Sequence, residues 1–317
     1  MDRIATNYEQ SNALTGIALK VGSVVIFVAM ASCIKAGGEG VPPGQIVFLR
    51  SLPAMIPVLA FLAARRQLHT AFHTRHSLSH LWRGLVGVSA MACGFYAITH
   101  LPLPDAIALG YAKPLAMVIL AALFLGEAVR LYRWSAVLVG LVGVMIISWP
   151  LLSLFDGDFW HNTRALGVVA ALISAVLAAF AMVLVRRLVA TERTPTIVLY
   201  FSLSATVISL ATLPFGWVLI DWTQLVLLVC AGLLGGIAQI MLTQSYRHAD
   251  VSTIAPFEYT SIIFGIALGY FLFGDTPQWS MLIGTAIVAA AGLFIIMREH
   301  RLGLERRSAR RFTTPEG

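Results

Sequence analysis

The chain alternates between long apolar segments and short connections that hold most of its charged residues. Each apolar segment is close to the length of about 20 residues that a helix needs to cross the hydrocarbon core of a bilayer. The pattern predicts ten such helices, at residues 12–35, 44–63, 81–99, 104–126, 132–149, 164–186, 195–219, 222–246, 251–273 and 279–297. We therefore expect an all-α integral membrane protein of about ten transmembrane helices.

The composition leaves room for little else. Of the 317 residues, 58% are hydrophobic and 12% are charged, whereas a soluble domain carries about 25% charged residues. A separate catalytic or nucleotide-binding domain does not fit beside ten helices. The polar segment 1–11 precedes an apolar run that is longer than the roughly 7–15 residues of a signal-peptide core. We expect this run to remain as the first helix.

Positive charge gathers on one side of the predicted membrane. The net charge is +7, but the basic residues fall in alternate connections, which is typical of cytoplasmic loops and does not indicate a nucleic-acid partner. These connections hold Arg65, Arg66, Arg75, Arg130, Arg133, Arg186, Arg187, Arg193, Arg247 and the arginines of a basic tail at 301–317. We expect a multi-pass protein of the cell inner membrane with both termini in the cytoplasm, and a tail with affinity for anionic lipid.

The two halves of the chain are related in sequence. Residues 100–127 match residues 248–275 at one constant offset, which aligns Tyr111 with Tyr259. The predicted domains are therefore two five-helix repeats, at 1–150 and 151–300.

An odd number of helices in each repeat makes the second copy enter the membrane from the opposite side. Such inverted repeats are typical of secondary transporters, whose binding site lies near the midplane between the repeats.

Two ionisable residues lie deep in the predicted helices. Lys113 falls in the fourth helix of the first repeat, and Glu258 falls in the equivalent helix of the second, where it matches Gly110, one turn from Lys113. A charge at this depth costs at least about 2.5–3.5 kcal/mol, so it is retained when it is paired or faces a watery cavity. Lys113 could bind a substrate carboxylate while Glu258 binds an ammonium group or a coupling proton. The alternative is a permanent ion pair that only holds the helices together.

The same two helices each contain a proline, Pro114 and Pro256, which removes a helical hydrogen bond and kinks the helix. Backbone freed at this depth must be buried in protein or line water, so the paired kinks indicate either the binding region or a packing feature. Tyr111, Tyr259 and Tyr96 are candidates for an aromatic wall that contacts a planar or cationic substrate. Each could equally be an ordinary core or bilayer-facing aromatic.

Two further basic residues lie nearer to helix ends. Arg50 is either a substrate-binding residue or one that extends to the membrane interface, and Lys20 is expected to extend to the interface. Gly232 and Gly236 have the spacing that lets helices pack closely.

No cofactor or metal site is expected. Cys33, Cys93 and Cys230 lie in separate apolar segments without metal-ligand spacing. Four histidines between residues 69 and 80 would share one helical face. They lack an acidic or Cys ligand, so a solvated cytoplasmic loop is favoured over a metal site.

Each half ends its fourth helix with a similar tripeptide, Leu125-Gly126-Glu127 in the first and Phe273-Gly274-Asp275 in the second, and a tryptophan opens the next helix. In these features the chain resembles the EamA-like branch of the drug/metabolite transporter superfamily over almost its whole length, and it is similar to the aromatic amino acid exporters of that branch. The resemblance implies a ten-helix carrier, often an exporter of amino acids and related metabolites. Lys113 and Glu258 depart from the commoner form of the family.

Transport by alternating access accounts for the inverted repeat, the central charges and the kinked helices together. The sequence has no Walker-type phosphate-binding loop, so ATP is not expected as the direct driver. The alternatives are an intramembrane enzyme acting on a lipid-linked substrate, with His100 and Asp105 as the nearest candidates, a channel, or a structural or sensory membrane protein. The sequence predicts a secondary transporter, expected to export a small organic metabolite such as an amino acid. It leaves the substrate, the coupling ion and the oligomeric state open.

Overall fold

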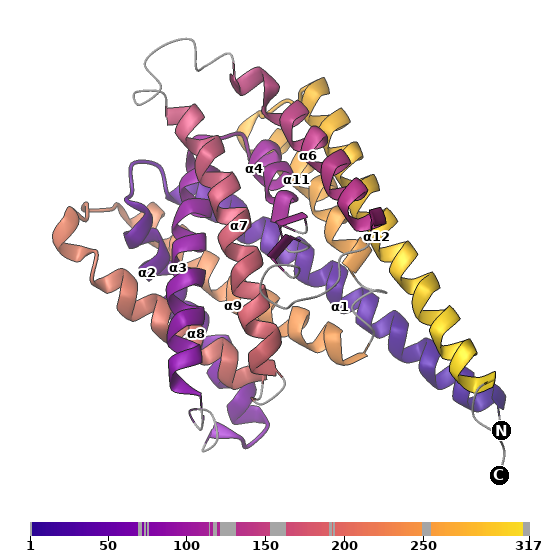
Figure 1. Cartoon of the computed structure of the whole chain (residues 1–317). Helices are drawn as coiled ribbons and strands as arrows, with labels where there is room; N and C mark the ends of the chain where they lie inside the picture. The colour runs from indigo at the N-terminus through magenta and orange to yellow at the C-terminus, as the bar shows by residue number, and fades with distance from the viewer. Residues whose placement is uncertain are drawn as a thin grey trace.

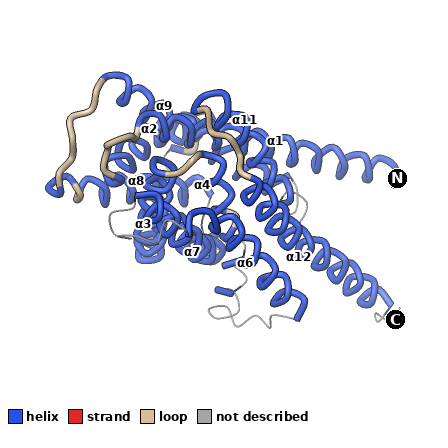
Figure 2. Tube along the Cα trace, turned by 90° about the horizontal axis from the view of Figure 1, so that it is seen from above, coloured by secondary structure: helices blue, strands red, loops and turns tan. Residues whose placement is uncertain are grey.

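The structure of this chain is a computed structural model. It describes residues 2–68, 72, 74, 76–113, 115–116, 119–120, 131–152, 163–189, 192, 194–248 and 255–312. Helices dominate these residues, and no strand occurs among them (Figures 1 and 2).

The ten α-helices in this part of the chain follow the ten segments predicted from the sequence. They are α1 (Asp2–Gly37), α2 (Pro43–Ala64), α3 (Ser77–His100), α4 (Leu103–Gly110), α6 (Leu131–Leu152), α7 (Thr163–Val189), α8 (Thr194–Leu210), α9 (Trp222–His248), α11 (Ser261–Phe273) and α12 (Trp279–Phe312). Two short 3-10 helices, η4 (Leu213–Phe215) and η5 (Ala255–Thr260), lie between them. The predicted all-α membrane fold is confirmed.

The helices of the two halves pack against each other in equivalent pairs. The first helix of each half packs against the third helix of the other, so α1 pairs with α9 and α7 pairs with α3. The second helices pack together, as α2 with α8, and so do the fourth, α4 with α11, and the fifth, α6 with α12. Exchanging the halves reproduces the same pairs, as expected for repeats related by a pseudo-twofold axis. The interior of the protein is therefore the interface between the halves.

Both ends of the chain lie at one end of the helical bundle. The first and last helices, α1 and α12, project from the bundle toward the same side (Figure 1) and extend beyond the other helices in the view from above (Figure 2). An even number of membrane crossings returns the chain to the side on which it began. Which compartment that side faces stays a prediction.

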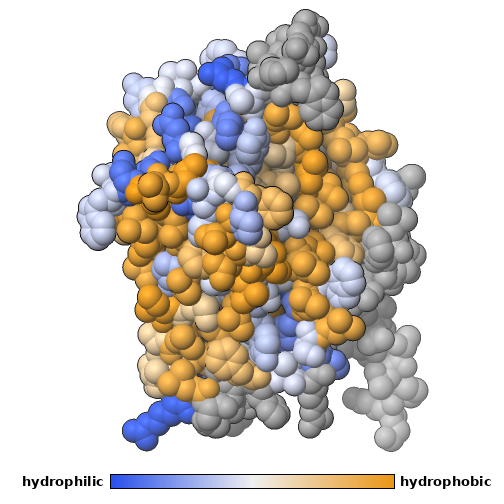
Figure 3. Space-filling view, turned by 90° about the vertical axis from the view of Figure 1, so that its left-hand side faces the viewer, coloured by the Kyte–Doolittle hydropathy of each residue, from blue (hydrophilic) through white to orange (hydrophobic). Residues whose placement is uncertain are grey.

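The surface of the bundle suits a bilayer. Five helices are long and apolar enough to span a membrane, and four shorter apolar helices accompany them within the described residues. The face shown in Figure 3 is hydrophobic across its middle, and hydrophilic residues gather toward its two ends. Large apolar side chains such as Ile56, Val207 and Phe271 are exposed on the helices. Extended apolar surface of this kind is unfavourable in water and favourable in lipid.

Several predicted helices have different bounds in the structure, and α1, for example, begins at Asp2 rather than at residue 12. α8 ends at Leu210 rather than near residue 219, because Pro214 cannot donate a hydrogen bond to the carbonyl of Leu210. The described part of segment 251–273 divides into η5 and α11 instead of forming one α-helix. α12 continues to Phe312, so much of the predicted basic tail extends the last helix.

Gly236 on α9 lies against the backbone of α2. A Cβ atom built on Gly236 would lie 2.6 Å from the carbonyl oxygen of Ala54 and 3.0 Å from Pro57. Because the nearest atom belongs to the backbone, a leucine must push α2 away, and we expect Gly236→Leu to destabilise the protein by about 1–3 kcal/mol. Thermal unfolding in detergent measures the effect, with Cys230→Leu at an exposed position of the same helix as the control. Equal melting temperatures for the two variants would contradict this packing.

Candidate functional site

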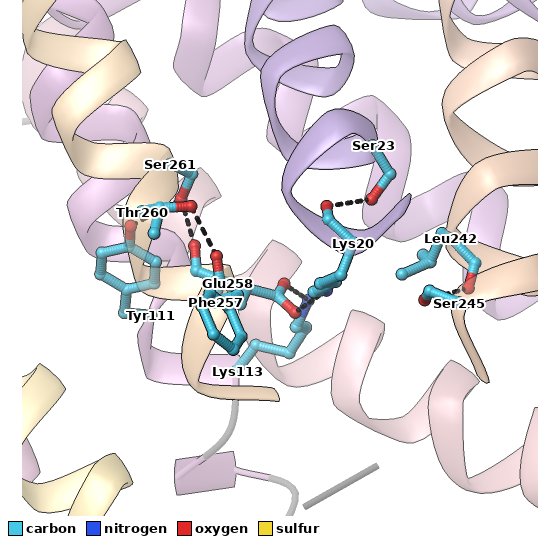
Figure 4. Close-up of polar contacts among 10 residues, drawn as sticks. All are labelled: Lys20, Ser23, Tyr111, Lys113, Leu242, Ser245, Phe257, Glu258, Thr260 and Ser261. Atoms are coloured by element: carbon cyan, nitrogen blue, oxygen red, sulfur yellow. Dashed lines mark hydrogen bonds and ion pairs between the residues drawn. The ribbon is translucent and has the colours of Figure 1, made fainter. Parts of the chain in front are cut away.

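Three charged side chains from different parts of the chain meet inside the bundle (Figure 4). Glu258 lies in η5, and its Oε2 accepts a hydrogen bond from Lys20 Nζ of α1 at 2.9 Å. Its Oε1 accepts a hydrogen bond from Lys113 Nζ at 3.0 Å. The structure thus brings Lys113 and Glu258 together and adds Lys20 as a third member. We call these three residues the central cluster.

Lys20 is the member that the sequence analysis placed elsewhere. Its expected extension to the membrane interface is wrong, because the side chain is only 3% exposed and its ammonium group binds Glu258. The apolar part of α1 begins at Leu14, so a lysine this close to the helix end is compatible with either arrangement. The signal that could have found it is the charge itself, since a lysine inside an apolar helix is retained where a partner offsets its cost.

The two lysines of the central cluster differ in their accessibility. The side chain of Lys113 is 32% exposed and that of Glu258 is 40% exposed, in contrast to the buried Lys20. Lys113 also lines a cavity of about 230 Å³ between α3, α4 and α7. The other lining residues are small or apolar: Gly94, Ala97, Ile98, Ala106, Gly110, Ala171, Ser174, Ala175 and Ala178. Among the described residues that line the cavity, Lys113 is therefore the charged one.

Gly110 helps to keep the space beside Lys113 open. It is the repeat equivalent of Glu258, and among the described residues nothing beyond the neighbouring backbone lies within 4 Å of a Cβ built on it. The equivalent position thus carries a carboxylate in the second half and no side chain in the first. The cavity beside Gly110 lies between α3 and α4 of the first half and α7 of the second.

The equivalent tyrosines of the two halves pack together next to the central cluster. The ring centroids of Tyr111 and Tyr259 lie 5.0 Å apart, with the rings tilted by 57°. The Tyr111 hydroxyl lies 2.6 Å from Ser261 Oγ, which donates to the carbonyl of Glu258 at 2.8 Å. Tyr111 is buried. The pair therefore fixes the backbone around Glu258, and its contact with a substrate stays a prediction.

The two equivalent helices both leave α-helical geometry near the central cluster. α4 ends at Gly110, four residues before Pro114, which lies outside the described residues. Pro256 lies in the 3-10 helix η5, which also carries Glu258 and directly precedes α11. Short 3-10 stretches within a helical segment often occur at functional hinges.

Arg50 and Tyr96 make other contacts within the described residues, apart from those of the central cluster given above. Arg50 is 8% exposed, and its two terminal nitrogens lie 4.0 Å and 3.6 Å from the Sδ atoms of Met91 and Met30. Its Nε has no hydrogen-bond partner within the described residues. Tyr96 stacks on His100 with a centroid distance of 4.0 Å. Arg50 is therefore a separate buried cation, and Tyr96 is engaged by its own helix.

His80 and His100 make contacts that hold neighbouring side chains and helix backbone. His80 was expected in a solvated loop, but it is a buried residue of α3 that stacks on Tyr200 at 4.5 Å between centroids. The expectation was wrong because α3 begins at Ser77, so His80 falls within the helix. His100 Nδ1 lies 2.8 Å from the carbonyl of Tyr96. His100 is thus bonded within its own helix, and in the described part of the chain no hydrogen bond or ion pair joins it to Asp105.

A second ion pair joins the two halves at the end of the bundle opposite the chain termini. Lys35 Nζ lies 3.4 Å from Asp275 Oδ2 and donates a hydrogen bond to the carbonyl of Leu101 at 2.7 Å. The same Oδ2 accepts a hydrogen bond from the backbone N–H of Leu103 at 2.9 Å, at the first residue of α4. We call the Lys35–Asp275 pair, with its bonds to Leu101 and Leu103, the distal latch. It links α1 and α4 of the first half to the end of α11 in the second.

Ten helices in two equivalent halves, an apolar exterior and a charged cluster beside a central cavity are the features of a secondary transporter. The chain belongs to the EamA-like transporter family, whose model matches residues 14–149 and 165–298.

Several proteins of known function are similar to this chain over most of its length. It is 30% identical over 285 residues to the pseudopaline exporter CntI of Pseudomonas aeruginosa, covering 87% of this chain and 94% of that protein. It is 30% identical over 290 residues to the riboflavin transporter of Rhizobium johnstonii, covering 91% and 90%. It is 28% identical over 290 residues to the S-adenosylmethionine uptake transporter of Rickettsia felis, covering 91% and 94%. These relatives are transporters and not enzymes.

A solved crystal structure is also similar, with a TM-score of 0.63 at 20% sequence identity over 92% of this chain and 99% of that chain. At this identity the likeness supports the fold alone. The chain is thus a secondary transporter of small metabolites. The relatives named above do not single out aromatic amino acid exporters.

Proposed function

We propose that this chain exports a small organic metabolite with a carboxylate group, such as an amino acid, across the cell inner membrane by alternating access. The observation that carries the proposal is the position of Lys113, which lines the cavity and shares the carboxylate of Glu258 with Lys20. An ionisable residue that reaches a cavity in the membrane interior is a candidate for binding a charged part of the substrate. For a lysine, that part is an anionic group.

Glu258 is the candidate for the opposite end of a zwitterionic substrate. Its carboxylate remains 40% exposed, so a substrate ammonium group or a coupling proton could reach it. The ammonium group would take the place of one lysine, and the substrate carboxylate would meet the lysine so released. An exchange of this kind keeps charges paired, which avoids the cost of an isolated charge in the membrane interior.

The direction of transport is part of the proposal. The similarity to an exporter supports export, and the one-sided arginines support cytoplasmic termini. Because a relative of similar coverage is an uptake protein, the direction needs its own measurement in vesicles of known orientation.

Proteoliposomes loaded with individual ¹⁴C-labelled L-amino acids test the proposal. We expect saturable efflux and counterflow for at least one of them, and flux at least about tenfold lower for Lys113→Met, because a hydrogen bond to a charged group contributes about 1.5–3 kcal/mol. Imposed pH gradients test proton coupling in the same vesicles. A wild-type protein that exchanges none of the labelled compounds contradicts an amino acid substrate. Flux that does not saturate would indicate a channel instead.

A further inference from the structure

Lys20 and Lys113 both bind one carboxylate, that of Glu258. We propose that Lys20 is a positioning residue, which keeps Glu258 paired so that Lys113 can leave it and bind the carboxylate of the substrate. This inference rests on the proposed function and assigns a role to a residue that does not line the cavity.

The surroundings of Lys20 fit a permanent partner of Glu258. Its side chain is 3% exposed, and within the described residues its ammonium group bonds to Glu258 and to no other side chain. α1 packs against both η5 and α11, which hold Glu258 in place beside it (Figure 4). Separation of Lys20 from Glu258 would leave a buried ammonium group without its partner, which is strongly unfavourable. Lys20 therefore stays on the carboxylate.

The surroundings of Lys113 fit an exchangeable partner. It is 32% exposed, it lines the cavity, and it follows the end of α4 at Gly110. A substrate in the cavity can therefore reach its ammonium group without displacing the buried side of the central cluster.

The second lysine changes the energetics of substrate binding. With Glu258 held by Lys113 alone, release of Lys113 would leave the carboxylate isolated in the membrane interior until the substrate ammonium group reached it. With Lys20 in place, Glu258 keeps a charged partner after Lys113 moves. The inference thus predicts that preference for a carboxylate substrate depends on Lys20, although Lys20 does not touch the substrate.

The test measures how strongly each variant prefers a carboxylate to the matching carboxamide. Counterflow of a ¹⁴C-labelled amino acid from the panel above is inhibited by that amino acid or by its carboxamide, and the ratio of the two inhibition constants is the readout. We expect the wild type to prefer the carboxylate at least about tenfold, and Lys20→Met and Lys113→Met to lose most of this preference.

The double variant Lys20→Met/Glu258→Gln distinguishes positioning from a merely structural role. With no carboxylate left to isolate, Lys113 is again available, and we expect the preference for carboxylate to return toward the wild-type ratio. Lys20→Arg keeps the positive charge and is expected to retain the preference from the start. The amino acid and its carboxamide both carry the ammonium group. Any loss of ammonium binding caused by Glu258→Gln therefore affects both inhibition constants and cancels in their ratio.

Several results would overturn the inference. A double variant with no more preference than Lys20→Met would do so, as would a wild type that binds the carboxamide as well as the carboxylate. A wild type without flux for any compound overturns the amino acid proposal as well, whereas normal flux without the rescue overturns only the role of Lys20. Melting temperatures in detergent show whether each variant is folded. If Lys20→Met alone fails to fold, the role of Lys20 is tested by comparing the carboxylate preference of the folded double variant with that of Lys113→Met.

Discussion

Adding Lys20→Met to the double variant Lys113→Met/Glu258→Gln is expected to recover the stability that the double variant loses, without recovering transport. From the sequence, the double substitution removes both central charges. In the structure it leaves the ammonium group of Lys20 buried without its carboxylate. Removal of one partner of a buried pair costs about 3–5 kcal/mol, so the double variant should melt well below the wild type. The triple variant contains no charge at the central cluster and should avoid this cost.

Thermal unfolding in detergent and flux in proteoliposomes separate the two effects. We expect the triple variant to approach the wild-type melting temperature and to transport at least about tenfold more slowly, since it has no cation in the cavity wall. A double variant as stable as the triple variant would show that Lys20 needs no carboxylate. Near-normal flux in the folded triple variant would show that the central cluster is purely structural, and would remove Lys113 and Glu258 from the site.

The helices were predictable because the bilayer imposes their length. Each crossing needs about 20 apolar residues and a fully bonded backbone, so apolar runs and helices coincide closely. The differences occur where local backbone chemistry changes the helix. Pro214 ends α8 early, and Pro256 accompanies the 3-10 helix that precedes α11. The sequence indicated the proline beside Glu258, but not the conformation of the backbone around it.

The contact between Lys113 and Glu258 followed from the internal repeat. The constant offset placed both residues in equivalent helices, and in the structure these helices pack together as α4 and α11, with η5 leading into α11. The contact of Lys20 with Glu258 crosses 238 positions of sequence and joins helices that are not repeat equivalents. Only the packing of α1 against η5 brings it about. Repeat analysis alone therefore found two members of the central cluster and missed the third.

The distal latch is a second set of contacts that could not be predicted from the sequence. In the sequence, Lys35 ends the predicted helix 12–35 and Asp275 follows the predicted helix 251–273, and neither position indicates a partner. Their contact depends on the turn between α3 and α4, where the backbone supplies the carbonyl of Leu101 and the N–H of Leu103. Backbone partners of this kind carry no signal in residue identity.

Weakening the distal latch is expected to open the cavity toward the end of the bundle opposite the termini. The latch holds the start of α4 against the end of α11, and the side chains of Leu101 and Leu103, whose backbone groups take part in it, are buried. Asp275 also lies at the N-terminus of α4, where a negative charge is favourable. Loss of one charged hydrogen bond costs about 1.5–3 kcal/mol. We expect Lys35→Met and Asp275→Asn each to raise the open population about 10–150-fold.

The polarity of the latch gives a further expectation. The carbonyl of Leu101 requires a donor and the N–H of Leu103 requires an acceptor. Exchanging the two charges, as Lys35→Asp with Asp275→Lys, restores an ion pair but presents each backbone group with the wrong partner. We therefore expect the exchanged variant to remain as open as the single variants, in contrast to an ion pair that acts through charge alone.

A cysteine in the cavity measures the opening without any substrate. Gly110→Cys has space for its side chain and is placed in a background with Cys33, Cys93 and Cys230 changed to alanine. The rate of its reaction with a membrane-impermeant thiol reagent, added on the side opposite the termini, should rise in each latch variant. Asp221→Asn is the control, because Asp221 is an exposed carboxylate that caps the start of α9 and lies outside the latch. Equal rates in the latch variants, the control and the parent would show that Lys35 and Asp275 do not hold this end closed.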